Sequence, residues 1–464
     1  MTVPLASAPT ISQQLADFID KFGGSAIPAA VRERAKYLML DAIGIAFAST
    51  HYAFAHQLLS GMRSLAGSGT CSLIGLADPL PLRDAVLMNA ALVHGLDYDD
   101  THVGAIVHPT ASALPCAMGV AQSIDASGAD LLAAYILGVE TVVRVCGAAK
   151  GGFHHAGFHP TGIAAHFSCA LQAGWLYGLN ARQLTMAQGL VGSTAAASQE
   201  FLEEGAWNKR LHPGWASVAG ITAAHLARNG YVGPTKTYEG RFGLYQIHLQ
   251  ERANEVDYAT ITARLGERWE TSEVAIKPYP ACHLVHACAD AAIALRNKHQ
   301  LKPEDIVSVQ ALIPEHAFHI IAQPEANKIK PTNDYDAKFS VQFVTATCLV
   351  LGKCGLAELE QDTLNNPLIL DLARRVSYAA DPDSTYPKYF SGGVVITTRN
   401  GQTLRHHEPI NRGTGERALT GDEISAKYRE NAAMVLPTRR VEQVRDAILG
   451  IESLSARAFM ALLR

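Results

Sequence analysis

Residues 94–109 read His-Gly-Leu-Asp-Tyr-Asp-Asp-Thr-His-Val-Gly-Ala-Ile-Val-His-Pro and concentrate three carboxylates, three imidazoles and a hydroxyl in one short segment. Apolar sequence lies on both sides, at 87–93 and 111–115. Charged groups between buried helices have to be paired, bound to a metal or used in chemistry, because an isolated buried charge is costly. We therefore expect this segment to form one wall of an active site inside a mainly helical protein.

The composition is that of a well-buried globular protein. Of the 464 residues, 48% are hydrophobic and 18% are charged, and no apolar run reaches the ~18 residues of a membrane span. The net charge of -4 predicts neither a nucleic-acid partner nor a membrane partner. No secretory signal is evident, and the eight cysteines are typical of core residues in a reducing compartment. The sequence therefore predicts a cytoplasmic protein.

Apolar residues recur at helical spacing through most of the first 265 residues. Many of these segments are rich in Ala and Gly and apolar on nearly all sides, which is typical of helices at the centre of a large domain. The helices are expected at 11–22, 31–48, 85–96, 111–124, 129–149, 161–177, 181–198 and 217–228. From residue 422 onward the pattern is helical again and ends in an amphipathic helix at 453–463.

The pattern changes near residue 270. A strand is expected at 308–313, and 394–405 predicts a hairpin because Asn400-Gly401 supplies the positive φ angles of a two-residue turn. Helices are expected at 283–298 and 340–351. The predicted fold class is mainly α, with a large all-helical domain (1–267 and 409–464) and a smaller inserted α+β lid domain (268–408). A cleft between two domains is a common place for a substrate.

The first segment supplies candidate catalytic groups. Asp97 and Thr101 lie four positions apart, so one helical turn would put them on one face. His108 precedes Pro109, which suits the start of a helix. A histidine there tends to stay neutral and can accept a proton. Two alternatives are a buried salt-bridge network and a hard-cation site. Because no EF-hand glycine or spacing accompanies the aspartates, we expect no metal.

Two further His-Pro pairs precede expected helices. His159 ends a loop rich in Gly and His at 151–159, where the free N–H groups of a helix start can hold a carboxylate. His212 follows Lys209, which can bind a substrate carboxylate or act as an acid. The plain alternative for both segments is a solvated surface turn.

Two segments of the expected lid carry further candidates. Lys277 opens a Lys-Pro-Tyr-Pro strap, and His286 lies four residues before Asp290, so the two can pair on one helix face. The alternative for this pair is a helix cap with a surface ion pair. Lys338, within Asp-Ala-Lys-Phe-Ser, is a further contact for an anion. The Cys and His residues near His286 lack a standard zinc spacing.

Taken in this order, these clusters resemble the MmgE/PrpD family over nearly the whole chain. The resemblance rests on the Asp-Tyr-Asp-Asp-Thr run at 97–101 with His108-Pro109, Gly-Phe-His-Pro at 157–160, Lys-x-Leu-His at 209–212, Lys-x-Tyr-Pro at 277–280 and Asp-Ala-Lys-Phe-Ser at 336–340. It implies a large all-helical domain with an α+β lid, usually as a homodimer, and chemistry without a metal or organic cofactor. The family includes 2-methylcitrate dehydratase, cis-aconitate decarboxylase and iminodisuccinate epimerase.

The same resemblance implies an active site. The residues that match active-site positions of the decarboxylase branch are Asp97, Thr101, His108, His159, Lys209 and His286. That branch also has a tyrosine in the lid before an Arg-Pro pair, whereas 325–331 contains none. The dehydratase has a different local sequence around its aspartates.

We therefore expect a cofactor-independent enzyme that abstracts a proton next to a carboxylate of a small di- or tricarboxylate. His108 and His159 are expected to act as acid and base, Lys209 as carboxylate clamp or second acid, Asp97 to orient a histidine, and Thr101 to bond substrate or Asp97. The residues expected to bind substrate are His286, Lys277, His102, His212 and Lys338.

The missing tyrosine and the different dehydratase pattern favour epimerisation of iminodisuccinate. The alternatives are a lyase similar to 2-methylcitrate dehydratase, a lyase similar to cis-aconitate decarboxylase, and a non-catalytic protein that binds small acids.

Overall fold

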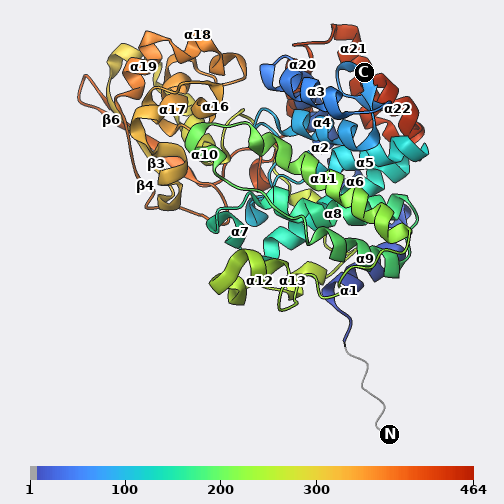
Figure 1. The fold of residues 1–464 in the computed structure, drawn as a ribbon. Coiled ribbons are helices and arrows are strands. Elements are labelled where there is room, and N and C mark those ends of the chain that lie inside the picture. The colour runs from blue at the N-terminus through green and yellow to red at the C-terminus, as the bar shows by residue number, and fades with distance from the viewer. Residues whose placement is uncertain (1–7) are drawn as a thin grey trace.

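A large body of helices built from both ends of the chain carries most of the core (Figure 1). The computed structural model describes residues 8–464. The longer helices of the body are α1 (Ile11–Asp20), α2 (Ala29–Ser49), α3 (Ala53–Leu65), α4 (Leu82–His94), α5 (Thr110–Ile124), α6 (Gly128–Ala148), α8 (Pro160–Leu176), α9 (Ala181–Val191), α11 (His212–Arg228), α20 (Gly421–Ala432) and α21 (Thr438–Leu449). Its shorter helices are α7 (Gly152–His155), α10 (Phe201–Glu204), α12 (Leu244–Leu249), α13 (Ala259–Thr262) and α22 (Ala456–Leu462).

Small residues allow the central helices of the body to pack closely. A Cβ atom on Gly220 of α11 would lie 2.5 Å from Cys169 Cβ and 2.6 Å from Ala170 N of α8. No segment long and apolar enough to span a membrane was expected from the sequence, but the length and apolar composition of helix α6 would suffice to cross one. Of that apolar window, however, 94% is buried inside the protein, and Glu140 and Arg144 form an ion pair within the helix. Helix α6 is thus a core helix.

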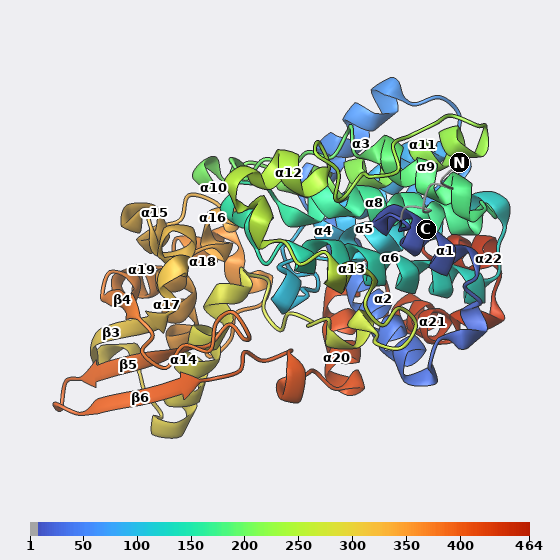
Figure 2. The same ribbon diagram turned by 90° about the horizontal axis from the view of Figure 1, so that it is seen from below.

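The smaller part of the fold contains a four-stranded sheet in the order β4-β3-β5-β6. Strand β3 (Ile306–Ile313) pairs in parallel with β4 (Val376–Ala380) and antiparallel with β5 (Gly392–Thr398), which pairs antiparallel with β6 (Thr403–Glu408). A hairpin at this place is confirmed, and Figure 2 shows it reaching away from the helical body. The expected two-residue turn is wrong, because the last strand pair is Thr397 with Thr403 and only Gly401 (φ 82) of the Asn400-Gly401 pair has a positive φ. The helices of this smaller part are α14 (His286–His299), α15 (Glu325–Ile329), α16 (Asp334–Lys338), α17 (Val341–Leu351), α18 (Gln361–Leu364) and α19 (Pro367–Ala373).

The mainly α fold class is confirmed. The buried apolar residues form two clusters, and the second combines side chains from 275–396 with Val103 and Phe201 of the helical body. The body is not purely helical, because a small hairpin joins β1 (Cys71–Leu73) to β2 (Leu76–Leu80). The predicted domain boundaries at 267/268 and 408/409 stay predictions.

Several expected helices differ from the observed ones at their ends; the helix expected at 217–228, for example, begins at His212. Two of the differences concern segments near the boundary between the two clusters. The segment expected to be helical to residue 198 ends at Val191, and the chain then turns toward the second cluster. The helix expected from residue 283 begins at His286, because a 3-10 turn occupies His283–Val285. Both differences change which side chains face the boundary between the two clusters.

The contact between α8 and α11 predicts that Gly220→Ala destabilises the protein by about 1–3 kcal/mol, because the added methyl group meets backbone atoms that cannot rotate away. The midpoint of urea unfolding measures this loss. Gly61→Ala on α3 is the matched control, since nothing lies within 4 Å of its added Cβ, and it is expected to stabilise by about 0.5–1 kcal/mol. Equal midpoints for both variants would contradict the close packing.

Candidate active site

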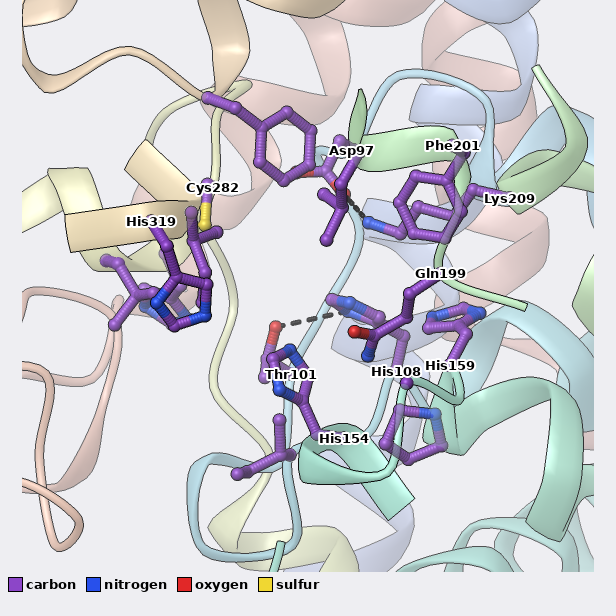
Figure 3. A pocket seen from close by; sticks show the side chains of 18 of the residues that line it. Asp97, Thr101, His108, His154, His159, Gln199, Phe201, Lys209, Cys282 and His319 are labelled. Carbon is purple, nitrogen blue, oxygen red and sulfur yellow. Dashed lines mark hydrogen bonds and ion pairs between the residues drawn. The ribbon is translucent and has the colours of Figure 1, made fainter. Parts of the chain in front are cut away.

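A pocket of about 430 Å³ lies where the helical body meets the smaller part of the fold, which contains the four-stranded sheet. This smaller part is called the lid below. Figure 3 shows side chains from both parts pointing into it. The polar residues that line it are Asp97, Thr101, His108, His154, His155, His159, Ser198, Gln199, Glu200, Glu203, Lys209, Lys277, Cys282, His283, His316, His319 and Tyr386. Its volume lies within the range of small-molecule sites.

One carboxylate and two lysines form the most strongly charged part of the pocket. Lys209 Nζ donates to Asp97 Oδ1, and Lys277 Nζ lies 3.4 Å from Asp97 Oδ2 and donates to the Asp97 carbonyl at 2.8 Å. Burial opposes ionisation of Asp97, but the two lysines outweigh it and hold the pKa of this carboxyl well below its usual range. Two cations facing one carboxylate leave an excess positive charge, which suits an anionic ligand.

His108 is held as a neutral base. Its Nδ1 lies 2.8 Å from the Asp100 carbonyl and 3.2 Å from Thr101 Oγ1. Because a carbonyl can only accept, Nδ1 carries the proton and Nε2 is left with a free electron pair. Burial lowers the pKa of His108 to about 3. The imidazole is therefore neutral near pH 7, and Figure 3 shows it at the pocket wall.

His159 belongs to a stack of imidazoles beside His108. Its ring stacks on His94 with centroids 5.4 Å apart, and its Nδ1 lies 3.1 Å from His212 Nδ1. His94 Nδ1 in turn lies 2.7 Å from the buried Asp99 carboxylate. Burial, followed by the charges of His94 and Lys209, keeps the pKa of His159 well below its ordinary value. His159 is thus a second neutral imidazole, oriented by two other histidines.

Helix starts place these histidines. Pro109 caps α5, His159 caps α8, and His212 is the first residue of α11, so each His-Pro pair begins a helix as the sequence predicts. The start of a helix carries partial positive charge, which favours a neutral imidazole and an anionic ligand.

Six of the predicted site residues line the pocket: Asp97, Thr101, His108, His159, Lys209 and Lys277. Two expected roles need correction. Asp97 pairs with Lys209 and Lys277 instead of orienting a histidine, because its left-handed backbone (φ 53) directs it toward the lysines. For Thr101, the expected bond to Asp97 is wrong, because the hydroxyl contacts His108. The other expected role of Thr101, a bond to substrate, stays a prediction.

Four predicted substrate-binding residues do not line the pocket, two of them in the helical body. His102 Nδ1 accepts a hydrogen bond from the Ala105 N–H at 3.2 Å, so its ring closes a local turn. His212 contacts His159 from behind and therefore supports a pocket residue.

The other two lie in the lid. His286 Nε2 lies 3.0 Å from the Ala281 carbonyl, and the turn before α14 presents His283 to the pocket in its place. Asp290 accepts a hydrogen bond from Tyr279 at 2.6 Å and does not pair with His286. Lys338 lies 3.5 Å from Asp334 and lines a separate pocket.

The metal alternative at the aspartates finds no matching geometry. Asp97 faces two lysines, Asp99 faces His94, and Asp100 accepts hydrogen bonds from Thr110. Between residues 8 and 464, no group of three or more His, Cys, Asp or Glu side chains has the arrangement of a metal site.

Sequence reasoning missed several pocket residues and one supporting residue. His94, the first residue of the 94–109 segment, stacks on His159 and had no predicted role. The pocket residues without a predicted role include Gln199, Cys282, His283, His154, His155, His316 and His319. His154 and His155 lie in the loop at 151–159, whose richness in Gly and His was a sequence signal for a site, although only His159 was given a role.

Asp100 predicts a pH dependence of stability. Burial raises its pKa to about 8, so the folded state holds a proton that the unfolded state releases near pH 4. The stability that this proton contributes is complete below about pH 4 and is lost as pH rises toward 8. Asp100→Asn keeps the shape without the titration. Its unfolding free energy, minus that of the wild type, should therefore rise by about 1.4 kcal/mol per pH unit in this window.

Chemical unfolding at pH 5, 6, 7 and 8 measures this difference. Asp78→Asn is the control, because Asp78 is exposed and pairs only with Arg63 at the surface. A constant difference for Asp100→Asn across the four pH values would show that Asp100 is ionised throughout.

Comparison with known proteins identifies the family of this chain. The MmgE/PrpD N-terminal domain matches residues 13–257, and the MmgE/PrpD C-terminal domain matches residues 279–452. Similar proteins include cis-aconitate decarboxylase of Aspergillus terreus, 26% identical over 96% of this chain and 94% of that protein. Cis-aconitate decarboxylase of Mus musculus is 25% identical over 96% of this chain and 91% of that protein. Cis-aconitate decarboxylase of Homo sapiens is 25% identical over 91% of this chain and 88% of that protein. The chain belongs to the MmgE/PrpD family.

Proposed function

We propose that this protein is a lyase that acts on a small di- or tricarboxylate by proton transfer at a carbon next to a carboxylate, with cis-aconitate as the first substrate to test. The observation that carries the proposal is the pairing of Asp97 with Lys209 and Lys277 beside the neutral imidazoles of His108 and His159.

The two lysines provide the means to bind a carboxylate. Lys209 and Lys277 together carry one more positive charge than Asp97 neutralises, and both are buried. Phe201 and Phe339 lie 5.9 and 5.4 Å from Lys209 Nζ, so the cation is partly shielded from water. Electrostatic interactions are stronger in such surroundings, which favours stabilisation of negative charge that develops on a substrate carboxylate.

The histidines provide the means to transfer a proton. When an acid such as cis-aconitate loses CO2, the electron pair of the broken C–C bond forms a new double bond. The former double bond then takes up a proton at the carbon next to a remaining carboxylate. His108 and His159 lie within this pocket, and an anionic substrate raises the pKa of a neighbouring imidazole because it favours the protonated form. Either ring can therefore collect a proton and deliver it to carbon.

The comparisons favour the lyase alternatives over the epimerisation of iminodisuccinate expected from the sequence, because the similar proteins are named cis-aconitate decarboxylases. The lid also contributes a tyrosine to the pocket, Tyr386, from a segment other than 325–331. The absence of a tyrosine from 325–331 keeps dehydration of a hydroxy-tricarboxylate as the second candidate.

Proton NMR in deuterated water tests the reaction class. With cis-aconitate, we expect CO2 release and deuterium at the product carbon next to a carboxylate. With 2-methylcitrate, an alkene without CO2 would indicate dehydration, and exchange in iminodisuccinate without an alkene would restore the epimerase. No reaction with all three acids would contradict the proposal.

Lys209→Met is expected to lower kcat/KM by about 100-fold or more, because it removes a buried cation from the carboxylate site. Steady-state kinetics with the acid that reacts measures the loss. Lys298→Met, at an exposed position of α14, is the matched control and should retain wild-type rates. Equal rates for both variants would remove Lys209 from the mechanism.

His108→Gln and His159→Gln are each expected to lower kcat by about 10²–10⁴-fold, the usual contribution of a general acid or base. Circular dichroism should show that the fold is retained. His299→Gln, also exposed on α14, is the control. Full activity in both His variants would overturn the acid–base assignment.

A further inference from the structure

Four histidines without a role in the proton-transfer scheme surround the outer part of the pocket. His154 and His155 end α7 of the helical body, whereas His316 and His319 lie on consecutive helical turns of the lid, Glu315–Ala317 and Phe318–Ala322. Figure 3 shows His154 and His319 entering the pocket from different sides. Imidazoles from two parts of the fold therefore face the same space.

These imidazoles are free of polar partners among residues 8–464. In the part of the chain that the structure describes, none of their side chains forms a hydrogen bond or an ion pair. His316 packs against Tyr386 with ring centroids 3.7 Å apart, which limits its movement. By contrast, His94 and His407 each pair with an aspartate. Unpaired, accessible N–H groups in a pocket are available to a ligand.

The imidazoles of this cluster can offer N–H donors to an anion. Burial, followed by the neighbouring His155, His316, His319 and Lys209, lowers the pKa of His154 to about 4. Burial, followed by His155 and His319, also lowers the pKa of His316 to about 4, so both rings are neutral near pH 7.

Three carboxylates lie in the same region, but none forms a salt bridge with these histidines among the described residues. Glu255 acts on His155, together with the opposing Arg252, and Glu200 and Glu203 line the pocket from the loop before α10 and from α10 itself. An incoming carboxylate would therefore find imidazole donors without displacing a salt bridge.

We propose that His154, His316 and His319 form an outer carboxylate subsite that binds the third carboxylate of a tricarboxylate and so selects this substrate class over dicarboxylates. This inference rests on the proposed function, in which Lys209 and Lys277 bind the inner carboxylates. Because the subsite is divided between α7 and the lid, only an acid long enough to reach from the lysines to the histidines contacts both parts of the fold.

Binding of two unreactive acids tests the subsite. Tricarballylate has three carboxylates and neither a double bond nor a hydroxyl, and succinate has two carboxylates. Isothermal titration of the full chain should show tighter binding of tricarballylate. His154→Gln and His319→Gln should each weaken the affinity for tricarballylate by about tenfold, as expected for a lost hydrogen bond to a charged group. The affinity for succinate should stay within about twofold of the wild-type value. His299→Gln is the control and should change neither affinity.

The outcomes separate the two proposals. If the wild type binds neither acid, the proposed carboxylate function fails. If the wild type binds both acids and the two variants keep both affinities, the outer subsite is wrong while the proposed function stands. An equal loss of affinity for both acids in the variants would also overturn the subsite, because the change would then lie in the shared inner site. A rise in KM without a fall in kcat, measured with the reacting tricarboxylate, is the expected kinetic result.

Discussion

The buried contact of Asp97 with Lys209 and Lys277 is the constraint on which the rest of the site depends. It joins the chain just after α4, the short 3-10 helix Asn208–Leu211 and the segment at the start of the lid. A buried charge without its partner costs several kcal/mol, so these three segments have to meet. Their meeting point lies beside the boundary between the two hydrophobic clusters and gives the pocket a buried contact with two cations and one carboxylate.

Around this charged contact, burial controls the protonation state of the histidines. His108 and His159 are neutral because both rings are surrounded by protein, and their orientation is set by a carbonyl, a threonine and two further imidazoles. His94 connects His159 to the ionised Asp99, so a fixed negative charge lies one imidazole behind the pocket wall. Such an arrangement suits proton transfer, since a positive charge formed on the inner rings is stabilised without being permanent.

The two parts of the fold contribute different groups. The helical body supplies Asp97, the neutral imidazoles and Lys209, whereas the lid supplies Lys277, His283 and the outer His316 and His319. A pocket divided in this way depends on both parts, since each part contributes groups to the inner contact and to the outer cluster.

Much of the fold and part of the site follow from local sequence. The helical segments, the hairpin near Asn400-Gly401 and the three His-Pro helix starts depend on neighbouring residues, and each was predicted correctly, although the turn type of the hairpin was not. Three features of the site were not predictable from the sequence. They are the partners of Asp97, the presence of His283 instead of His286 in the pocket, and the position of Lys338. They depend on the left-handed backbone at Asp97, on the turn before α14 and on contacts between distant segments. The sequence by itself determined which residue types and helices this protein has. Only the tertiary structure decided which side chains share the pocket, because the direction and the burial of a side chain depend on packing between segments far apart in the chain.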